Sequence, residues 1–181
     1  MSEGLDQNRG RVGQEARHEL EAAVRELLTA QSTLTLATCG PDGPWAAAVF
    51  FASDDALNLY FVSDPRTRHG RDLVARGCAA GAVHPDCDHW NDIRGLQLEG
   101  SVCVLDGAAR ETALQCYLAK FPRIRSLYEQ PKGDGETLIA SRLRQASLFR
   151  LVPARIRLID NGRGFGFKAE LQLHETSDFN G

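Results

Sequence analysis

The segment TLTLATCGPDGPWAAAVFFASDDALNLYFV spans residues 33–62 and decides the fold class. Its first part, 33–38, alternates threonine with apolar residues, which is typical of a half-buried strand. The GPDGP turn at 40–44 leads into a second apolar strand at 45–52, which is rich in small residues. A Ser-Asp-Asp turn then follows, and it is too short for a parallel crossover before the third strand, 57–62. The segment therefore predicts an antiparallel meander.

The sequence on either side of this meander predicts further strands and helices. Before it, apolar residues at spacings of three and four over 15–28 predict a helix that covers the sheet. After it, we expect a helix at 66–76 that ends at Gly77, and then two strands, 78–84 and 93–105, joined by a polar loop at 85–92. A helix at 108–120 follows. Near the end of the chain we expect strands at 148–151 and 155–160 on either side of Pro153, and a last strand at 163–168 after an Asn161-Gly162 turn. Residues 123–145 give no prediction. Together, the predicted strands and helices indicate a mainly β (α+β) fold, which is an antiparallel barrel with helices on its outside.

Length and composition fit one soluble domain. The chain has 181 residues, of which 43% are hydrophobic and 25% are charged, so disordered and fibrous classes are excluded. A net charge of −3 argues against a general nucleic-acid binder. No apolar run approaches the ~20 residues of a membrane span, and no signal peptide is present, so we expect a cytoplasmic protein without a membrane partner. We divide it into a flexible segment at 1–13, a domain at 14–173 and a tail at 174–181.

The cysteines and one histidine-containing loop raise the question of a metal. The 5 cysteines are scattered and form no CxxC pair, so we expect reduced thiols packed as small hydrophobic residues. His84, Cys87 and His89 lie close together and are possible ligands for a transition metal. Their spacing matches no standard zinc motif, however, and they fall in a loop between strands. We therefore expect a polar hairpin there and no metal site.

Residues 60–69, YFVSDPRTRH, carry the strongest chemical signal of the chain. Here a strand leads into a helix that Ser63 or Asp64 can cap, with Pro65 in the first helical turn. Hydroxyls, arginines and the N–H groups of a helix start are together suited to a phosphate. The same residues also fit a helix start with a solvated basic face. His69 and Asp72, three residues apart, suggest either an acid–base pair or an ordinary ion pair, and we favour the ion pair.

The order of segments resembles the pyridoxamine 5′-phosphate oxidase-like family of FMN-binding split β-barrels. The resemblance covers residues 27–168 and rests on LATCGPDGPWAAAVFFASDDALNLYFVSDPRTRHGRDL (36–73), IRGLQLEGSVCVL (93–105) and LFRLVPARIRLIDNGRGFGFK (148–168). The last of these is similar to the final strands of a small, poorly characterised bacterial branch. The resemblance implies an antiparallel split β-barrel with flanking helices, with a flavin bound at a two-fold interface of a homodimer.

The resemblance also implies where the flavin would bind. Small residues on the second strand would lie beside the ring, the turn after the third strand would hold the phosphate, and the fifth strand would face the pyrimidine edge. The implied residues are Ala47, Ala48 and Val49 at the ring, Ser63, Thr67, Arg68 and His69 at the phosphate, and Gln97 at the pyrimidine, and Val62 is a further cofactor-binding candidate. Phe167 and Lys168 are further candidates, because such residues reach the flavin from the other subunit in several relatives. Many relatives have Lys or Arg in place of His69, so here the charge depends on pH.

Three functions remain open at this stage. The first is an FMN-dependent oxidoreductase acting on a small molecule, because the sequence offers no nucleophile arrangement that would carry the chemistry instead. The second is a flavin-binding or sensing module without turnover. The third is a haem-binding protein, with His84, His89 or His174 as candidate iron ligands. Catalytic residues and the natural substrate are not predicted.

Overall fold

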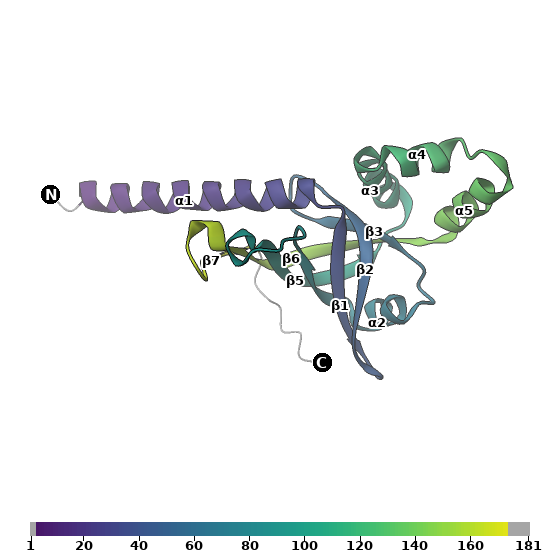
Figure 1. Ribbon diagram of the computed structural model, residues 1–181, viewed down its shortest axis with the longest axis horizontal. Helices are drawn as coiled ribbons and strands as arrows, with labels where there is room; N and C mark the ends of the chain where they lie inside the picture. Colours follow the sequence, from purple (N-terminus) through teal and green to yellow (C-terminus); the bar gives the residue numbers. More distant parts are fainter. Residues whose placement is uncertain (1–2, 174–181) are drawn as a thin grey trace.

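The computed structural model describes the backbone of residues 3–173 and the side chains of residues 13–173. In this part of the chain the strands form one sheet in the order β3-β2-β1-β4-β5-β6-β7, and β3 also pairs with β6. All pairs are antiparallel, so β1 to β6 close into a barrel and β7 extends it beyond β6 (Figure 1). The strands are β1 (Thr33–Gly40), β2 (Gly43–Ser53), β3 (Leu59–Ser63), β4 (Cys78–Val83), β5 (Arg94–Val104), β6 (Ser147–Asp160) and β7 (Lys168–Gln172). The predicted antiparallel barrel with flanking helices is confirmed.

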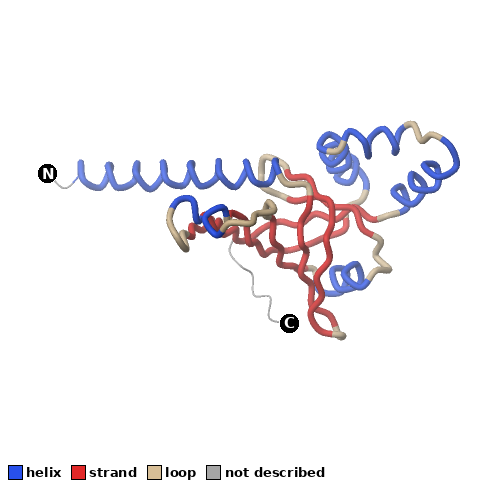
Figure 2. The backbone as a smooth tube through the Cα atoms, viewed as in Figure 1, coloured by secondary structure: helices blue, strands red, loops and turns tan. Residues whose placement is uncertain are grey.

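The helices lie outside the barrel (Figure 2). Helix α1 extends well past the sheet on one side, α3, α4 and α5 gather at the opposite end, and α2 lies beside the β1–β2 hairpin (Figure 1). The helices are α1 (Glu3–Ala30), α2 (Arg68–Arg76), α3 (Gly107–Lys120), α4 (Pro122–Glu129) and α5 (Gly133–Gln145), with short 3-10 turns η1 (Trp90–Asp92) and η2 (Asn161–Arg163). Helix α1 thus begins earlier than the predicted 15–28, and the unassigned residues 123–145 form two helices.

Two strand predictions need correction. The predicted strand at 163–168 is wrong, because η2 and a turn fill most of this stretch and β7 begins only at Lys168. The predicted break at Pro153 is also absent, since β6 runs through it while β5 shifts register between Glu99 and Gly100. A Cβ at Gly100 would lie 2.0 Å from the carbonyl oxygen of Val152, so only glycine allows the two backbones this close at the irregularity.

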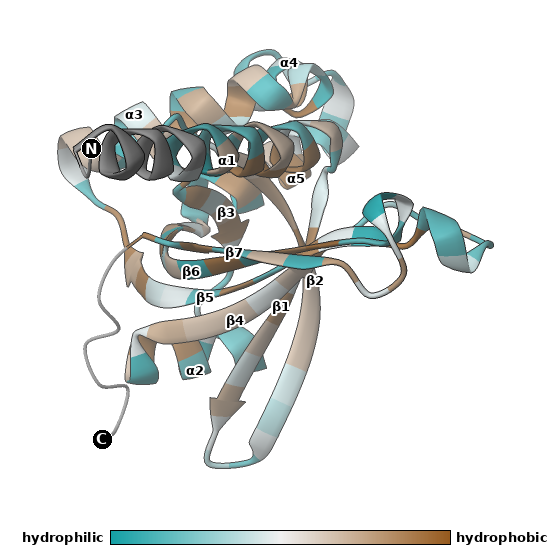
Figure 3. Ribbon diagram, turned by 90° about the vertical axis from the view of Figure 1, so that its left-hand side faces the viewer, coloured by the Kyte–Doolittle hydropathy of each residue, from teal (hydrophilic) through white to brown (hydrophobic). Residues whose placement is uncertain are grey.

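The main core fills the barrel and extends under α1. The rings of Phe61 and Phe149 stack inside it with centroids 5.3 Å apart, and both side chains are almost fully buried. From α1, Val24 and Leu28 pack onto the same cluster. Hydrophobic segments, brown in Figure 3, run along β1 and β3. Alternation in the strands and the periodicity in α1 therefore place one apolar face of each element inward.

A second, smaller core joins α3 to the outside of the barrel. Tyr117 and Leu118 of α3 pack there against Ala52 of β2 and Leu148 of β6. At the end of α3, the Lys120 ammonium donates to the carbonyl oxygens of Leu28 (2.7 Å) and Gln31 (2.6 Å), which close the C-terminal end of α1. Burial lowers the pKa of Lys120 to about 8, so this cation is still charged at neutral pH. These contacts hold α3 to the outside of the barrel and to the end of α1.

The cysteine prediction is correct in part. All five cysteines are free, but Cys39, Cys87 and Cys103 are exposed and the other two are half-buried, so they are not packed in the core as expected. Among the aromatic residues of β2, Phe51 is buried while Trp45 and Phe50 keep about half of their surface exposed. Within residues 3–173, no helix is both long enough and apolar enough to span a membrane.

Candidate functional site

The junction between β3 and α2 positions the predicted phosphate residues. Thr67, rather than Ser63 or Asp64, caps α2: its hydroxyl accepts the Gly70 N–H at 3.1 Å and donates to the Asp64 carbonyl at 2.7 Å. The helix therefore begins at Arg68, two residues later than predicted, and it ends at Gly77 as predicted, with a φ of 64°. A Cβ at Gly70 would lie 2.4 Å from the Asp64 carbonyl oxygen, so glycine lets the connecting turn fold tightly onto the helix.

Ser63 and His69 meet at this junction. The Ser63 hydroxyl lies 2.6 Å from Nε2 of His69, and the Thr67 hydroxyl lies 3.3 Å from the same nitrogen. Burial lowers the pKa of His69 below its usual value, and the charge of Asp72 only partly opposes this effect. His69 is therefore a neutral imidazole at neutral pH, and a negatively charged ligand would favour its protonation.

Asp72 serves a different role from the one predicted. Its buried carboxylate accepts a 2.9 Å hydrogen bond from the Thr38 hydroxyl of β1, and a Cβ at Gly40 would overlap it. Within the described residues no ion pair joins it to His69, so the predicted i,i+3 ion pair is wrong. The bond to Thr38 instead fixes α2 against the β1–β2 hairpin.

The two arginines of the junction are both engaged. Arg66 forms a 2.6 Å ion pair with Asp64, which lowers the pKa of that carboxyl to about 2. Arg68 donates to the carbonyl oxygens of the hairpin turn, the shortest bond being 2.7 Å to Asp42, and its guanidinium lies 4.6 Å from the centre of the Trp45 ring. The fixed positive charges near the predicted phosphate site are therefore already partnered within the chain.

A cavity of about 520 Å³ lies where this junction faces the helices α3, α4 and α5, which we call the roof. Its barrel side is formed by five of the residues that sequence reasoning selected: Ala48, Val49, Val62, Ser63 and His69. Phe50 of β2 also lines the cavity. The roof side is formed by residues that sequence reasoning missed: Tyr117, Arg123, Ile124, Leu127, Ile139 and Leu143. Most of these lie in 123–145, where the sequence pattern was uninformative. We call this space the roofed cavity.

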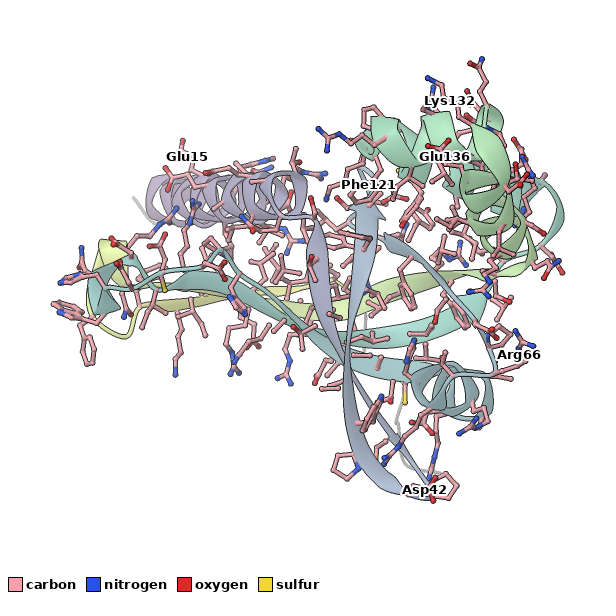
Figure 4. All side chains as sticks on the ribbon, turned by 45° about the vertical axis from the view of Figure 1, so that its right-hand side comes forward. Glu15, Asp42, Arg66, Phe121, Lys132 and Glu136 are labelled. Atoms are coloured by element: carbon pink, nitrogen blue, oxygen red, sulfur yellow. The ribbon has the colours of Figure 1, made fainter. Side chains whose placement is uncertain are left out.

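A second cavity of about 680 Å³ adjoins the first. Both are lined by Val62, Ser63, Ile139 and Leu143, so these side chains stand between them. The second cavity, which we call the side cavity, is further lined by Asp64, Pro65, Arg66, Arg142, Gln145 and Ala146. In Figure 4, Arg66 lies on the β3–α2 segment below α5, which carries Glu136 and begins just after Lys132. Ser63 thus lies at the point where both cavities meet.

The other predicted residues lie outside these cavities in the single chain. Ala47 is half-buried on β2, and Thr67 and Arg68 stand at the start of α2. Gln97 is exposed on β5, in a row that runs Ala48, Thr35, Ala82, Gln97 across four strands. At the usual strand spacing, Gln97 is about 14 Å from Ala48. It lines a separate hollow of about 360 Å³.

The last two candidates lie at the other end of the molecule. Phe167 packs beside Ala16 and Leu20 of α1, and Lys168 is exposed at the start of β7. A role for them at the cavity therefore depends on a second subunit, as the resemblance implied.

The histidines considered as metal or haem ligands have local roles. His84 lies 3.1 Å from the carbonyl oxygen of the next residue, Pro85, and His89 accepts the Asn91 N–H and so caps η1. Both are exposed in the β4–β5 connection. Across the described residues, no three metal-binding side chains gather into one group. His174 lies outside the described residues.

Comparisons with known proteins agree with this geometry. The family model described as Pyridoxamine 5′-phosphate oxidase matches residues 20–160. A UPF0306 protein of Klebsiella pneumoniae (strain 342) is 30% identical over 151 residues, which is 83% of this chain and 91% of that protein.

Two solved structures share the fold at low sequence identity. A heme binding protein from Mycobacterium smegmatis has a TM-score of 0.65 at 18% identity, and the match covers 84% of this chain but only 57% of that one. A FAD-binding protein from Mesorhizobium loti has a TM-score of 0.55 at 16% identity over 73% of this chain and 88% of that one. One fold therefore carries both haem and flavin in these neighbours.

Proposed function

Because the chain belongs to the pyridoxamine 5′-phosphate oxidase family, within which it is similar to the bacterial UPF0306 proteins, we propose that it is an FMN-binding oxidoreductase acting on a small molecule. The observation that carries this proposal is the donor-rich end of the roofed cavity. There Ser63 and His69 line the cavity beside the small side chain of Ala48, and Thr67 at the start of α2 contacts His69 from outside it. The phosphate of FMN suits the hydroxyl and imidazole donors, and its flat ring suits the space left by the small side chain of Ala48.

The residues at this point fit a phosphate. The hydroxyls of Ser63 and Thr67 both lie within hydrogen-bond distance of Nε2 of His69, and hydroxyl and imidazole groups can donate to an anion. The N–H groups of Arg68 and His69 precede the first intrahelical bond, which Arg71 makes to Thr67 at 2.9 Å. Arg66 is neutralised by Asp64, whereas Arg68 is bonded only to neutral carbonyl oxygens, so Arg68 and protonated His69 are the side chains that add positive charge here.

The roles of the chain's own residues follow from this fit. Ser63, Thr67 and His69 would hold the phosphate, while Ala47, Ala48 and Val49 allow a flat ring to approach the β2 backbone. When bound, FMN supplies the hydride and electron transfer that no side chain can perform. Tyr117 stays protonated because burial raises its pKa to about 12, so its hydroxyl is available as a donor at the roofed cavity. The chain thus binds and orients rather than reacts.

The absorbance spectrum of the purified protein, alone and after addition of FMN, haem or a deazaflavin, tests the proposal. We expect flavin bands and saturable binding of FMN. Anaerobic mixing of the FMN-loaded protein with NADH and NADPH then tests activity, with bleaching of the oxidised flavin spectrum as the expected result. A spectrum that stays oxidised with both would favour a sensing module or another electron donor.

Haem binding is the second candidate, because the mycobacterial neighbour is a heme binding protein. His69 is the histidine that lines the roofed cavity, whereas His84 and His89 are exposed elsewhere. A Soret band that appears with haem and shifts in His69→Ala would support this candidate over FMN. Loss of that band in His84→Ala instead would place the iron at the β4–β5 loop.

We also propose a homodimer. Phe50, which lines the roofed cavity, and Trp45, near the hairpin turn of β2, are both about half exposed, and a second subunit would cover such surface. In the dimer, Phe167 or Lys168 of a partner subunit would reach the flavin, as the resemblance implies, and Gln97, about 14 Å from Ala48 within one chain, would do so from the partner as well. Light scattering at micromolar concentrations should show twice the chain mass, and a monomer throughout would contradict the proposal.

A further inference from the structure

The roofed cavity has an unusual balance of charge. None of its twelve lining residues carries a carboxylate, and its charged or polar side chains are those of Ser63, His69, Tyr117 and Arg123. The remaining lining residues are apolar. A cavity with donors and no acidic group favours an anionic ligand over a cationic or neutral one.

Arg123 is the cation of this cavity, and its guanidinium has no protein partner among the described residues. Six other arginines form ion pairs with carboxylates, namely Arg17, Arg66, Arg94, Arg155, Arg157 and Arg163, whereas the exposed Arg123, like Arg142, forms none among the described residues. Arg123 therefore keeps its donors available for a ligand, and its planar group can bind a carboxylate or phosphate through two bonds.

The start of α4 also favours an anionic ligand in the roofed cavity. Its N-cap, Phe121, makes no side-chain capping bond, and the first backbone bond of the helix runs from Arg125 N–H to the Phe121 carbonyl at 2.9 Å. The N–H groups of Arg123 and Ile124 thus lack the partner that an acidic or hydroxyl cap would supply. Both residues line the roofed cavity, so the positive end of the helix dipole adds to the charge of Arg123 there.

The rest of the roof side is apolar. Ile124 and Leu127 of α4 and Ile139 and Leu143 of α5 line the cavity, and about half of the surface of Ile139 is exposed. The volume of about 520 Å³ falls within the range of small-molecule pockets. These side chains provide an apolar wall next to the unpaired arginine.

We propose that the roof side of this cavity binds a small apolar molecule with one anionic end, whose anion pairs with Arg123 and the start of α4. This rests on the proposed function in one respect: in an FMN enzyme the bound molecule would be the substrate, held by the roof and facing the flavin on the barrel side. Arg123 then determines specificity, and Ser63 and His69 remain for the phosphate of the cofactor.

Calorimetric titration with two matched probes tests the proposal. The probes are 2-naphthoate and the neutral 2-naphthalenemethanol, each added to the protein with and without saturating FMN. We expect naphthoate to bind at least about tenfold more tightly than the alcohol, which corresponds to one charge-assisted contact. Arg123→Gln should remove this difference, and Arg123→Lys should restore part of it.

Arg142→Gln is the matched control, because Arg142 lies on the same roof but lines the side cavity. It should leave naphthoate affinity within about twofold. Leu127→Ala should weaken both probes equally, and circular dichroism should show that each variant is folded. Equal affinity of the parent protein for both probes, or unchanged selectivity in Arg123→Gln, would overturn the proposal.

FMN affinity is measured separately by flavin fluorescence, so that the two proposals can fail independently. Selective naphthoate binding in a protein that binds no FMN would refute the proposed cofactor and keep the anion site. If Arg123→Gln weakens FMN binding but leaves naphthoate selectivity unchanged, Arg123 holds the flavin phosphate and the present inference is wrong.

Discussion

The barrel and the roof differ in how completely they satisfy their own side chains. In the barrel, Phe61 and Phe149 are at most 1% exposed, and surface arginines such as Arg155 pair with glutamates. In the roof, α3 packs four buried residues onto the barrel, but the outer helices do not: α4 has no buried residue and α5 has one, Ala140. Packing in the barrel therefore determines stability, while unsatisfied groups of the roof are available for recognition.

The largest expected effect tests stability in the barrel against stability in the roof. Phe61→Ala should reduce the free energy of unfolding by about 3–5 kcal/mol, because it leaves a cavity beside Phe149. Leu138→Ala on α5 is the control, and since Leu138 is 56% exposed we expect a change below about 1 kcal/mol. Urea denaturation followed by circular dichroism measures both. Similar losses in the two variants would contradict the distinction between the regions.

The next prediction concerns Arg68, which belongs to both the barrel and the site. Arg68→Ala should weaken FMN binding by about 1–3 kcal/mol without unfolding the protein, because a charge near the phosphate is lost. Flavin fluorescence titration measures the affinity. Riboflavin, which lacks the phosphate, should bind both proteins equally. An equal loss for riboflavin would mean that Arg68 acts through the hairpin carbonyls it contacts, not through the phosphate.

A smaller effect should appear in the pH dependence of FMN binding. The pKa of half-buried His69 is lowered in the free protein, and a phosphate raises it in the complex, so binding takes up a proton at pH values between these two pKa values. Affinity should therefore fall as pH rises through this window, by at most about tenfold per pH unit. Of the charged groups around His69, Asp72 raises its pKa, whereas the positive charges of the adjacent Arg68 and of Arg123 across the cavity oppose its protonation.

Titrations of FMN between pH 5.5 and 8.5 measure this dependence. His69→Lys is the control, because it keeps a positive charge over the whole range while the phosphate of FMN titrates as before. The difference between the two profiles isolates His69. Parallel profiles for the parent protein and His69→Lys would show that His69 does not contact the phosphate.

The smallest expected effect concerns Gln97, which lies on the barrel surface away from the roofed cavity. Gln97→Leu should change FMN affinity by less than about 0.5 kcal/mol while altering the rate of flavin reduction. Anaerobic stopped-flow mixing with the nicotinamide that reduces the parent protein measures that rate. An unchanged rate would remove Gln97 from the flavin site and restrict the site to the roofed cavity.

The sequence alone predicted the barrel because its signals there are local. Alternation over residues 33–38 and the short turns of the meander fix strand direction, and this in turn determines which side chains face the core. Ser63 and His69 were found in the same way, since they flank one strand-to-helix junction. Residues 33–69 therefore contained both the fold class and the barrel side of the candidate site.

Only the tertiary structure revealed the roof side. Residues 123–145 form two short helices with one buried residue between them, so no apolar stripe marks them in the sequence. Arg123 is distant from His69 along the chain, and α3 brings the two to one cavity. The roles of Asp72 and Arg68 were likewise decided by contacts across the fold, with Thr38 and the hairpin carbonyls. Spacing within a helix shows which neighbours are possible, whereas the packing of helices against the barrel decides which of them are bonded.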